Sequence, residues 1–162
     1  MKKVIYGFIA GGILGVAAGF TLGIFYFPFL FPPPPAMEEV ADAENKRVVA
    51  TGQFIHANPS DPVHYGKGEV TVYEDLVHLG MDFEVGPGPA FHVYLVSEEV
   101  VTPDTIVDQT MYVDLGRLKA FEGSQNYPIP AGTKLSDYPH VVVWCEKFGV
   151  LISPAKLTFQ GS

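Results

Sequence analysis

A long apolar run near the N-terminus constrains this chain more than any other feature. Residues 4–31 contain no charged side chain, and Lys2 and Lys3 come directly before them. A helix needs about 20 apolar residues to cross the hydrocarbon core of a bilayer, and this run is longer than that. Basic residues favour the cytoplasmic side, so the lysine pair predicts a cytoplasmic N-terminus and an extracytoplasmic remainder. The sequence therefore predicts a cytoplasmic stub and one transmembrane signal anchor over residues 1–31.

A cleaved signal peptide is the alternative interpretation of this segment. The apolar core of a signal peptide is usually about 7–15 residues long, and this run is about twice that length. The small-residue sequence at 41–43 resembles a cleavage site, but it lies well past the apolar run. An uncleaved single-pass anchor in the lipid bilayer is therefore the favoured interpretation.

Glycine recurs at every fourth position along the apolar run, a spacing that places small residues on one helix face. Small residues in this register let two membrane helices approach closely. The pattern predicts a packing face for self-association or for a membrane partner. The residues are Gly7, Gly11, Gly15, Gly19 and Gly23.

A proline run and an acidic stretch separate the anchor from the rest of the chain. The four consecutive prolines Pro32–Pro35 favour an extended polyproline spacer, so residues 32–47 are predicted to be a solvated, Pro-rich acidic linker. The net charge is −8, and removing the two anchor lysines (−8 minus +2) leaves −10 on the remainder. Such acidity argues against a nucleic-acid partner, because phosphate binding needs clustered Lys and Arg.

Short apolar runs separated by Gly and Pro fill the remaining domain, residues 48–162. Several runs alternate with period two, and none has the pattern of a soluble amphipathic helix. This spacing predicts an all-β domain, an antiparallel β-sandwich or a barrel-like fold. In the run 77–85, Val77, Leu79, Met81, Phe83 and Val85 are expected to share one face. The expected strands are 48–56, 67–74, 77–85, 91–96, 111–118, 140–146 and 155–160.

The sequence contains few recognisable catalytic motifs. It has no nucleophile elbow, no phosphate-binding glycine loop and no H-E-x-x-H motif, so a hydrolase is unsupported and enzymatic activity stays open. A single cysteine excludes an intramolecular disulfide and a zinc site built on a cysteine pair. No two histidines have the spacing of a local metal site, so the sequence names no metal.

Cys145 is the residue with the widest range of possible chemical roles. A cysteine can act as a nucleophile, a redox thiol or a soft ligand to haem iron or copper, but a free cysteine is also among the most buried residue types. His64, in a Gly-rich turn between two expected strands, is the histidine best placed to assist it. Trp144 is a weaker candidate for binding, because it is next to Cys145 on an apolar strand.

Three stretches of this domain are distinctive: residues 112–119 (YVDLGRLK), 123–130 (GSQNYPIP) and 141–151 (VVVWCEKFGVL). Together with the upstream stretches 52–54, 68–73 and 93–95, they resemble the DM-thirteen family, a domain proposed for electron transfer. The resemblance covers about residues 48–160. It implies an all-β extracytoplasmic domain with Cys145 as the hallmark cysteine, acting as a bare thiol or as a ligand to a prosthetic group such as haem.

Two hypotheses of different classes follow. In the first, the protein is a membrane-anchored redox module that exchanges electrons with a membrane redox partner through Cys145. In the second, it is a surface binding or scaffolding domain, and Cys145 is a packed core residue.

Overall fold

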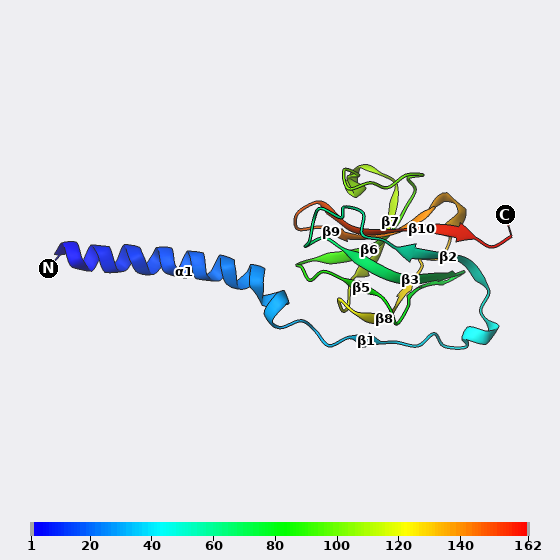
Figure 1. Ribbon diagram of the computed structural model, residues 1–162, viewed down its shortest axis with the longest axis horizontal. Coiled ribbons are helices and arrows are strands. Elements are labelled where there is room, and N and C mark those ends of the chain that lie inside the picture. Colours follow the sequence, from blue (N-terminus) through cyan, green and yellow to red (C-terminus); the bar gives the residue numbers. More distant parts are fainter. Residues whose placement is uncertain (1, 162) are drawn as a thin grey trace. The chain divides into compact units, whose positions relative to one another are not determined.

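The computed structural model describes residues 2–161 and divides the chain into two compact units, Met1–Pro32 and Pro33–Ser162. The first unit contains α1 (Lys2–Leu30), drawn in blue in Figure 1. The portion Lys2–Ile24 is apolar and long enough to cross a membrane, a character shared by membrane anchors and signal sequences. The predicted long apolar helix is therefore confirmed, and its role as an uncleaved membrane anchor stays a prediction. The five glycines lie on α1 with open space around them, and their packing role stays a prediction.

The second unit is one curled, mixed sheet that forms a half-barrel (Figure 1). Its strand order is β1-β8-β4-β3-β2-β10-β9-β6-β7, with β5 paired to β3. All strand pairs are antiparallel except β1 with β8, so the predicted all-β, barrel-like class is confirmed. The strands are β1 (Ala36–Met37), β2 (Val48–Phe54), β3 (Gly66–Tyr73), β4 (Leu76–Leu79), β5 (Glu84–Val85), β6 (Phe91–Val96), β7 (Tyr112–Arg117), β8 (Gly123–Pro128), β9 (His140–Cys145) and β10 (Val150–Phe159).

Strand β9 is buried on both faces, and its side chains alternate between two hydrophobic clusters. Val141, Val143 and Cys145 belong to the main core inside the curled sheet. Val142 and Trp144 point to the opposite face and pack in a smaller cluster with residues of β6 and β10. The period of two read from the sequence is confirmed, because successive strand side chains face opposite sides.

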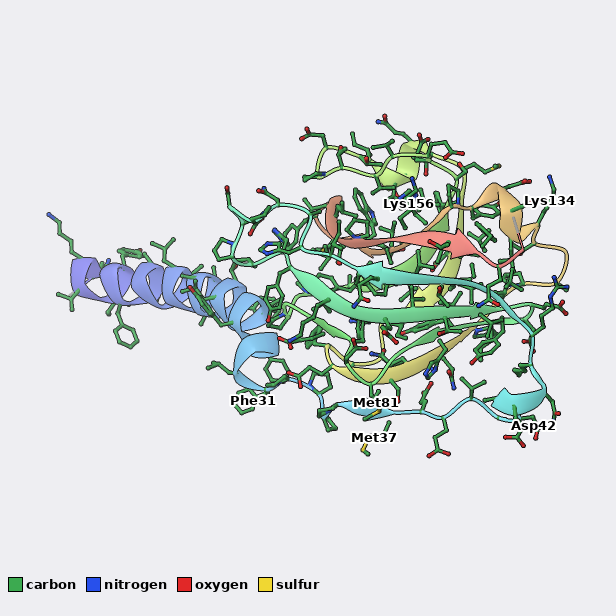
Figure 2. All side chains as sticks on the ribbon, turned by 45° about the vertical axis from the view of Figure 1, so that its right-hand side comes forward. Phe31, Met37, Asp42, Met81, Lys134 and Lys156 are labelled. Atoms are coloured by element: carbon green, nitrogen blue, oxygen red, sulfur yellow. The ribbon has the colours of Figure 1, made fainter. Side chains whose placement is uncertain are left out.

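The expected strand 77–85 is wrong as a single element. Its first part forms β4, which ends at Leu79, and its last two residues form β5. Between them the chain turns, with the Phe83 N–H donating to the Gly80 carbonyl at 3.1 Å. Met81 was expected on the buried face, but its side chain is 65% exposed (Figure 2). The turn at Gly80 interrupts the alternation, because a residue in a turn no longer follows the strand period.

Strand β8 was not expected from the sequence, and it organises one side of the sheet. Its residue Gln125 is fully buried, accepts hydrogen bonds from the backbone N–H groups of Lys119 and Ala120, and donates to the Ala120 carbonyl.

Part of the segment predicted to be a solvated, Pro-rich acidic linker lies along β8. Ala36–Met37 pairs with it, and the Glu38 carboxylate accepts hydrogen bonds from the Asn126 N–H and the Lys119 ammonium at 2.7 Å.

Candidate functional site

Cys145 is the last residue of β9 and lies beneath the surface. It is 1% exposed, and in register it stands between Phe91 of β6 and Val150 of β10. Its thiol donates a hydrogen bond to the Pro89 carbonyl, with a sulfur–oxygen distance of 3.2 Å. The structure thus places the thiol in the apolar core and gives it a partner in the loop that precedes β6.

Two opposing influences act on the acidity of this thiol. Burial raises the pKa of the Cys145 thiol, because the thiolate loses its hydration. The backbone N–H groups of Phe148 and Lys147 hydrogen-bond the sulfur and lower its pKa, but burial outweighs them. These two groups belong to the turn between β9 and β10. Cys145 is therefore a protonated thiol at neutral pH in this arrangement.

The segment 86–90 contacts the Cys145 thiol through the Pro89 carbonyl and is itself only half-buried beyond Gly86. At one end the Gly86 N–H donates to the Tyr65 carbonyl, and at the other the Glu146 N–H donates to the Ala90 carbonyl. Ala90 has a φ of 53°, a left-handed conformation that is unfavourable for a residue with a side chain. We call this segment, residues 86–90, the lid, because it is the layer that carries the thiol's hydrogen-bond acceptor.

His64 lies in the turn before β3, where it pairs with Asp61. Its Nδ1 is 2.6 Å from the Asp61 carboxylate, whose other oxygen accepts hydrogen bonds from the N–H groups of Val63 and His64. The hydrogen bond from His64 lowers the pKa of Asp61 to about 2, and the Val63 N–H adds to the effect. Among residues 2–161 no hydrogen bond joins His64 to Cys145. The role of His64 as an assisting residue stays a prediction.

Trp144 is adjacent to Cys145 in sequence, yet it faces the other side of the sheet. It is completely buried and packs with Tyr94 and Leu151. Its indole Nε1 has no hydrogen-bond partner in the described part of the chain. The ring is therefore a core residue of the outer cluster, and the binding role predicted for it stays untested.

Comparison with known families identifies the domain. A family model described as "Electron transfer DM13" matches residues 59–157. The chain belongs to the DM13 family. Comparisons with curated proteins and with solved structures gave no match. The DM13 assignment confirms the resemblance seen in the sequence and suggests a redox-related role.

The surroundings of Cys145 in this DM13 domain do not fit a haem. Haem iron would have to reach a cysteine thiolate directly. Here the sulfur is protonated, 1% exposed and hydrogen-bonded to Pro89, and the core packs around it.

One cluster of potential metal ligands in the DM13 domain cannot be predicted from the sequence. His92, Asp114 and Glu146 offer ligand atoms that all lie within 4.8 Å of one another. They come from β6, from β7 and from the residue after β9. Each type is common on surfaces, and nothing in their sequence spacing links them, so only strand pairing could reveal the cluster.

Proposed function

We propose that this protein is a membrane-anchored electron-transfer domain whose redox group is the Cys145 thiol, hidden beneath the lid. The family membership supports a redox role, and one observation about the site supports the choice of residue. The thiol's hydrogen-bond acceptor, the Pro89 carbonyl, belongs to a half-buried surface segment rather than to the core. Displacement of this single segment would expose the sulfur without unfolding the sheet.

Lid displacement would also change the acidity of the thiol. Burial is the largest cause of its raised pKa, whereas the N–H groups of Lys147 and Phe148 favour the thiolate. Those N–H groups belong to the turn after β9 and not to the lid. Opening would remove the desolvation and leave the N–H groups in place, so the open state would hold a more acidic and more nucleophilic thiol.

The chain has one cysteine, which excludes an intramolecular disulfide, and the redox step in this proposal is exchange with an external sulfur. The Cys145 thiolate attacks one sulfur of an external disulfide, and a mixed disulfide forms as the external S–S bond breaks. The leaving thiolate carries away the electron pair and takes up the proton that Cys145 released. An external thiol then attacks the mixed disulfide at its external sulfur, which restores the Cys145 thiol. The reactants are therefore a disulfide and a thiol, supplied by partners.

The anchor is part of the same proposal. Lys2 and Lys3 favour a cytoplasmic N-terminus, which would put the domain from Pro33 onward on the extracytoplasmic side, where disulfides persist. Carbonate extraction of membranes should leave the full-length protein in the pellet, and protease added to the outer side should digest the domain. Recovery of a soluble domain without α1 would instead identify residues 1–31 as a cleaved signal sequence.

The glycine register adds a partner to this proposal, a second membrane helix. Replacing Gly11, Gly15 and Gly19 with Ile should weaken any oligomer of the full-length protein in micelles, because the larger side chains hold the helices apart. An oligomer of unchanged strength would refute the packing role.

The near-complete burial of Cys145 favours a second function, a surface binding or scaffolding domain. In that case the cysteine is a small core residue, and Cys145→Ala leaves partner binding intact. The two functions differ in how the thiol becomes accessible: by lid opening in the first, and only by global unfolding in the second.

Thiol-exchange kinetics on the full-length protein in micelles decide between the two functions. The probe is an aromatic disulfide that releases a coloured thiolate when it reacts with Cys145. The test variant is Gly88→Ala, since a Cβ at Gly88 would clash with the Phe91 ring beneath the lid. Overpacking of this kind costs about 1–3 kcal/mol, so we expect exchange to become roughly tenfold faster or more.

The matched control is Gly52→Ala in β2, where a Cβ would lie 2.7 Å from the Lys156 carbonyl, remote in the fold from the lid. It should lower global stability, measured by urea unfolding, with little effect on exchange. If exchange in both variants follows global stability alone, the lid does not open and the binding function replaces the redox proposal.

A further inference from the structure

The outer face of the β9–β6–β7 sheet carries three potential metal ligands on adjacent strands. His92 is on the middle strand, Asp114 is on β7, and Glu146 directly follows β9. The His92 Nδ1 lies 3.2 Å from an Asp114 oxygen, and its Nε2 lies 3.4 Å from Glu146 Oε2. The His92 side chain is 19% exposed, and the two carboxylates are about twice as open. The cluster is thus half-sheltered and reachable from solvent.

Each carboxylate also accepts a hydrogen bond from a separate donor. The Tyr94 hydroxyl donates to Glu146 Oε1 at 2.6 Å, and the Gly116 N–H donates to Asp114 Oδ1 at 2.8 Å. On the other side, Glu146 Oε2 lies 3.4 Å from His92 Nε2, and both Asp114 oxygens lie 3.2 Å from His92 Nδ1. Outer-shell donors of this kind orient carboxylate ligands in metal sites.

The local backbone explains how Asp114 is positioned. The pairing of β6 with β7 shifts register between Val93 and Tyr94, so Leu115 is an extra residue on β7. Gly116 follows it with a φ of 114°, a conformation that a residue with a side chain rarely adopts. Bulges of this kind occur next to functional sites, where they redirect a side chain. This bulge turns the Gly116 N–H onto the Asp114 carboxylate.

The charge of the cluster also favours a cation. Two carboxylates converge on one imidazole, and no Lys or Arg makes an ion pair with either carboxylate in the part of the chain described. A neutral histidine and two carboxylates carry a charge of −2, which a divalent cation balances.

We propose that His92, Asp114 and Glu146 form a binding site for a divalent transition-metal ion such as Zn²⁺ or Mn²⁺. Imidazole nitrogen suits zinc and carboxylate oxygen suits both ions. Three protein ligands leave at least one position for water or for another ligand, which is typical of reactive rather than purely structural sites. Cys145 faces the other side of the sheet and is not a ligand, so this site does not depend on the redox role of the thiol.

Titration calorimetry on metal-free, full-length protein in micelles tests the site, with ZnCl₂ and MnCl₂ as probes. We expect one ion per chain. His92→Ala and Glu146→Gln should each weaken Zn²⁺ binding at least about tenfold, and Tyr94→Phe about 10–100-fold through the lost outer-shell donor. Circular dichroism checks that each variant is folded. Glu146 is exposed, so Glu146→Gln serves if His92→Ala fails to fold.

The matched control is His64→Ala. His64 pairs with one carboxylate, that of Asp61, whereas His92 lies between two carboxylates. The control variant should leave the stoichiometry and affinity unchanged. Broadening of the His92 ring resonances by Mn²⁺ in NMR would place the ion independently. Absence of stoichiometric binding, or binding that His92→Ala and Glu146→Gln do not weaken, would show that the cluster is an ion-pair triad only and would overturn the proposal.

Discussion

The two faces of the sheet at the end of β9 differ in almost every property that matters for chemistry. On the inner face, Cys145 lies in an apolar core, is protonated and has one polar partner in the lid. On the outer face, His92 and Glu146 are reachable from solvent, Glu146 accepts a hydrogen bond from the Tyr94 hydroxyl, and its other oxygen lies 3.4 Å from His92. The inner group needs a conformational change before it can react, and the outer groups need none. Neighbouring positions on one strand can thus support independent functions.

The largest effect should come from the small hydrophobic cluster on the outer face. Trp144→Ala removes a completely buried ring, and loss of a buried aromatic side chain typically costs about 3–5 kcal/mol. Urea unfolding measures the loss. Phe148→Ala, at a position 54% exposed, is the control and should cost less than about 0.5 kcal/mol. A loss below about 1 kcal/mol for Trp144→Ala would show that the outer face has no core of its own.

Cys145→Ala should have a smaller effect on stability. It removes one buried sulfur and the hydrogen bond to Pro89, for an expected loss of about 1–2 kcal/mol. Cys145→Ser keeps a donor for the Pro89 carbonyl and serves as the comparison in the same urea experiment. If Cys145→Ala leaves the free energy of unfolding unchanged, the inner face is not packed around the sulfur as described.

Tyr94→Phe should cost about 1 kcal/mol on the outer face. A hydrogen bond to a charged group contributes about 1.5–3 kcal/mol, and water can replace part of it because the Glu146 side chain is 43% exposed. The control is Tyr112→Phe, whose ring contacts Tyr94 edge-on but whose hydroxyl makes no hydrogen bond in residues 2–161. Equal losses in both variants would contradict the role of Tyr94 in holding Glu146.

The smallest effect should come from the His64–Asp61 pair, which lacks the second carboxylate of the His92 cluster. The pKa of Asp61 is about 2, below its ordinary value of 3.8, because His64 and the Val63 N–H bond the carboxylate. A lowered pKa stabilises the fold above about pH 4, and this contribution is lost as the pH falls toward 2. The contribution should be below about 1 kcal/mol, since the pair is partly exposed.

Acid unfolding of the protein and of Asp61→Asn measures this contribution. The variant should lose stability at neutral pH and should depend less on pH between about 4 and 2. Identical pH profiles would show that the pair contributes nothing to folding.

The sequence predicted those strands in which apolar residues form a continuous run or alternate with polar residues. Both faces of β9 are apolar, and the segment 91–96 is correctly bounded at both ends, with the Gly-Pro turn of the lid before it. It could not predict β8, because the buried positions of that strand hold polar residues such as Gln125, whose partners come from the chain just before it. Met81 shows the opposite case, an apolar residue in phase with its neighbours that a turn leaves exposed.

One candidate site can be read from the sequence, and the other can be recognised only in the folded structure. The sequence identifies Cys145 as a candidate site residue because it is the only cysteine and lies in a stretch that resembles the DM13 family. Both properties can be read directly from the sequence. The sequence indicated its burial only through the general tendency of free cysteines to be buried. The His92 cluster could not be predicted, because Asp114 and Glu146 were two among 18 acidic residues until strand pairing brought them to one histidine.

An apolar helix long enough to cross a membrane, an all-β domain, its family and a lone cysteine could all be read from the sequence, because length, period and composition are local properties. Tertiary structure alone decided that the cysteine lies beneath a lid, that residues 36–39 lie along β8, and that three polar side chains converge on the outer face. These features depend on register between strands far apart in the chain. Register is determined by the packing of the whole sheet, which no local pattern contains.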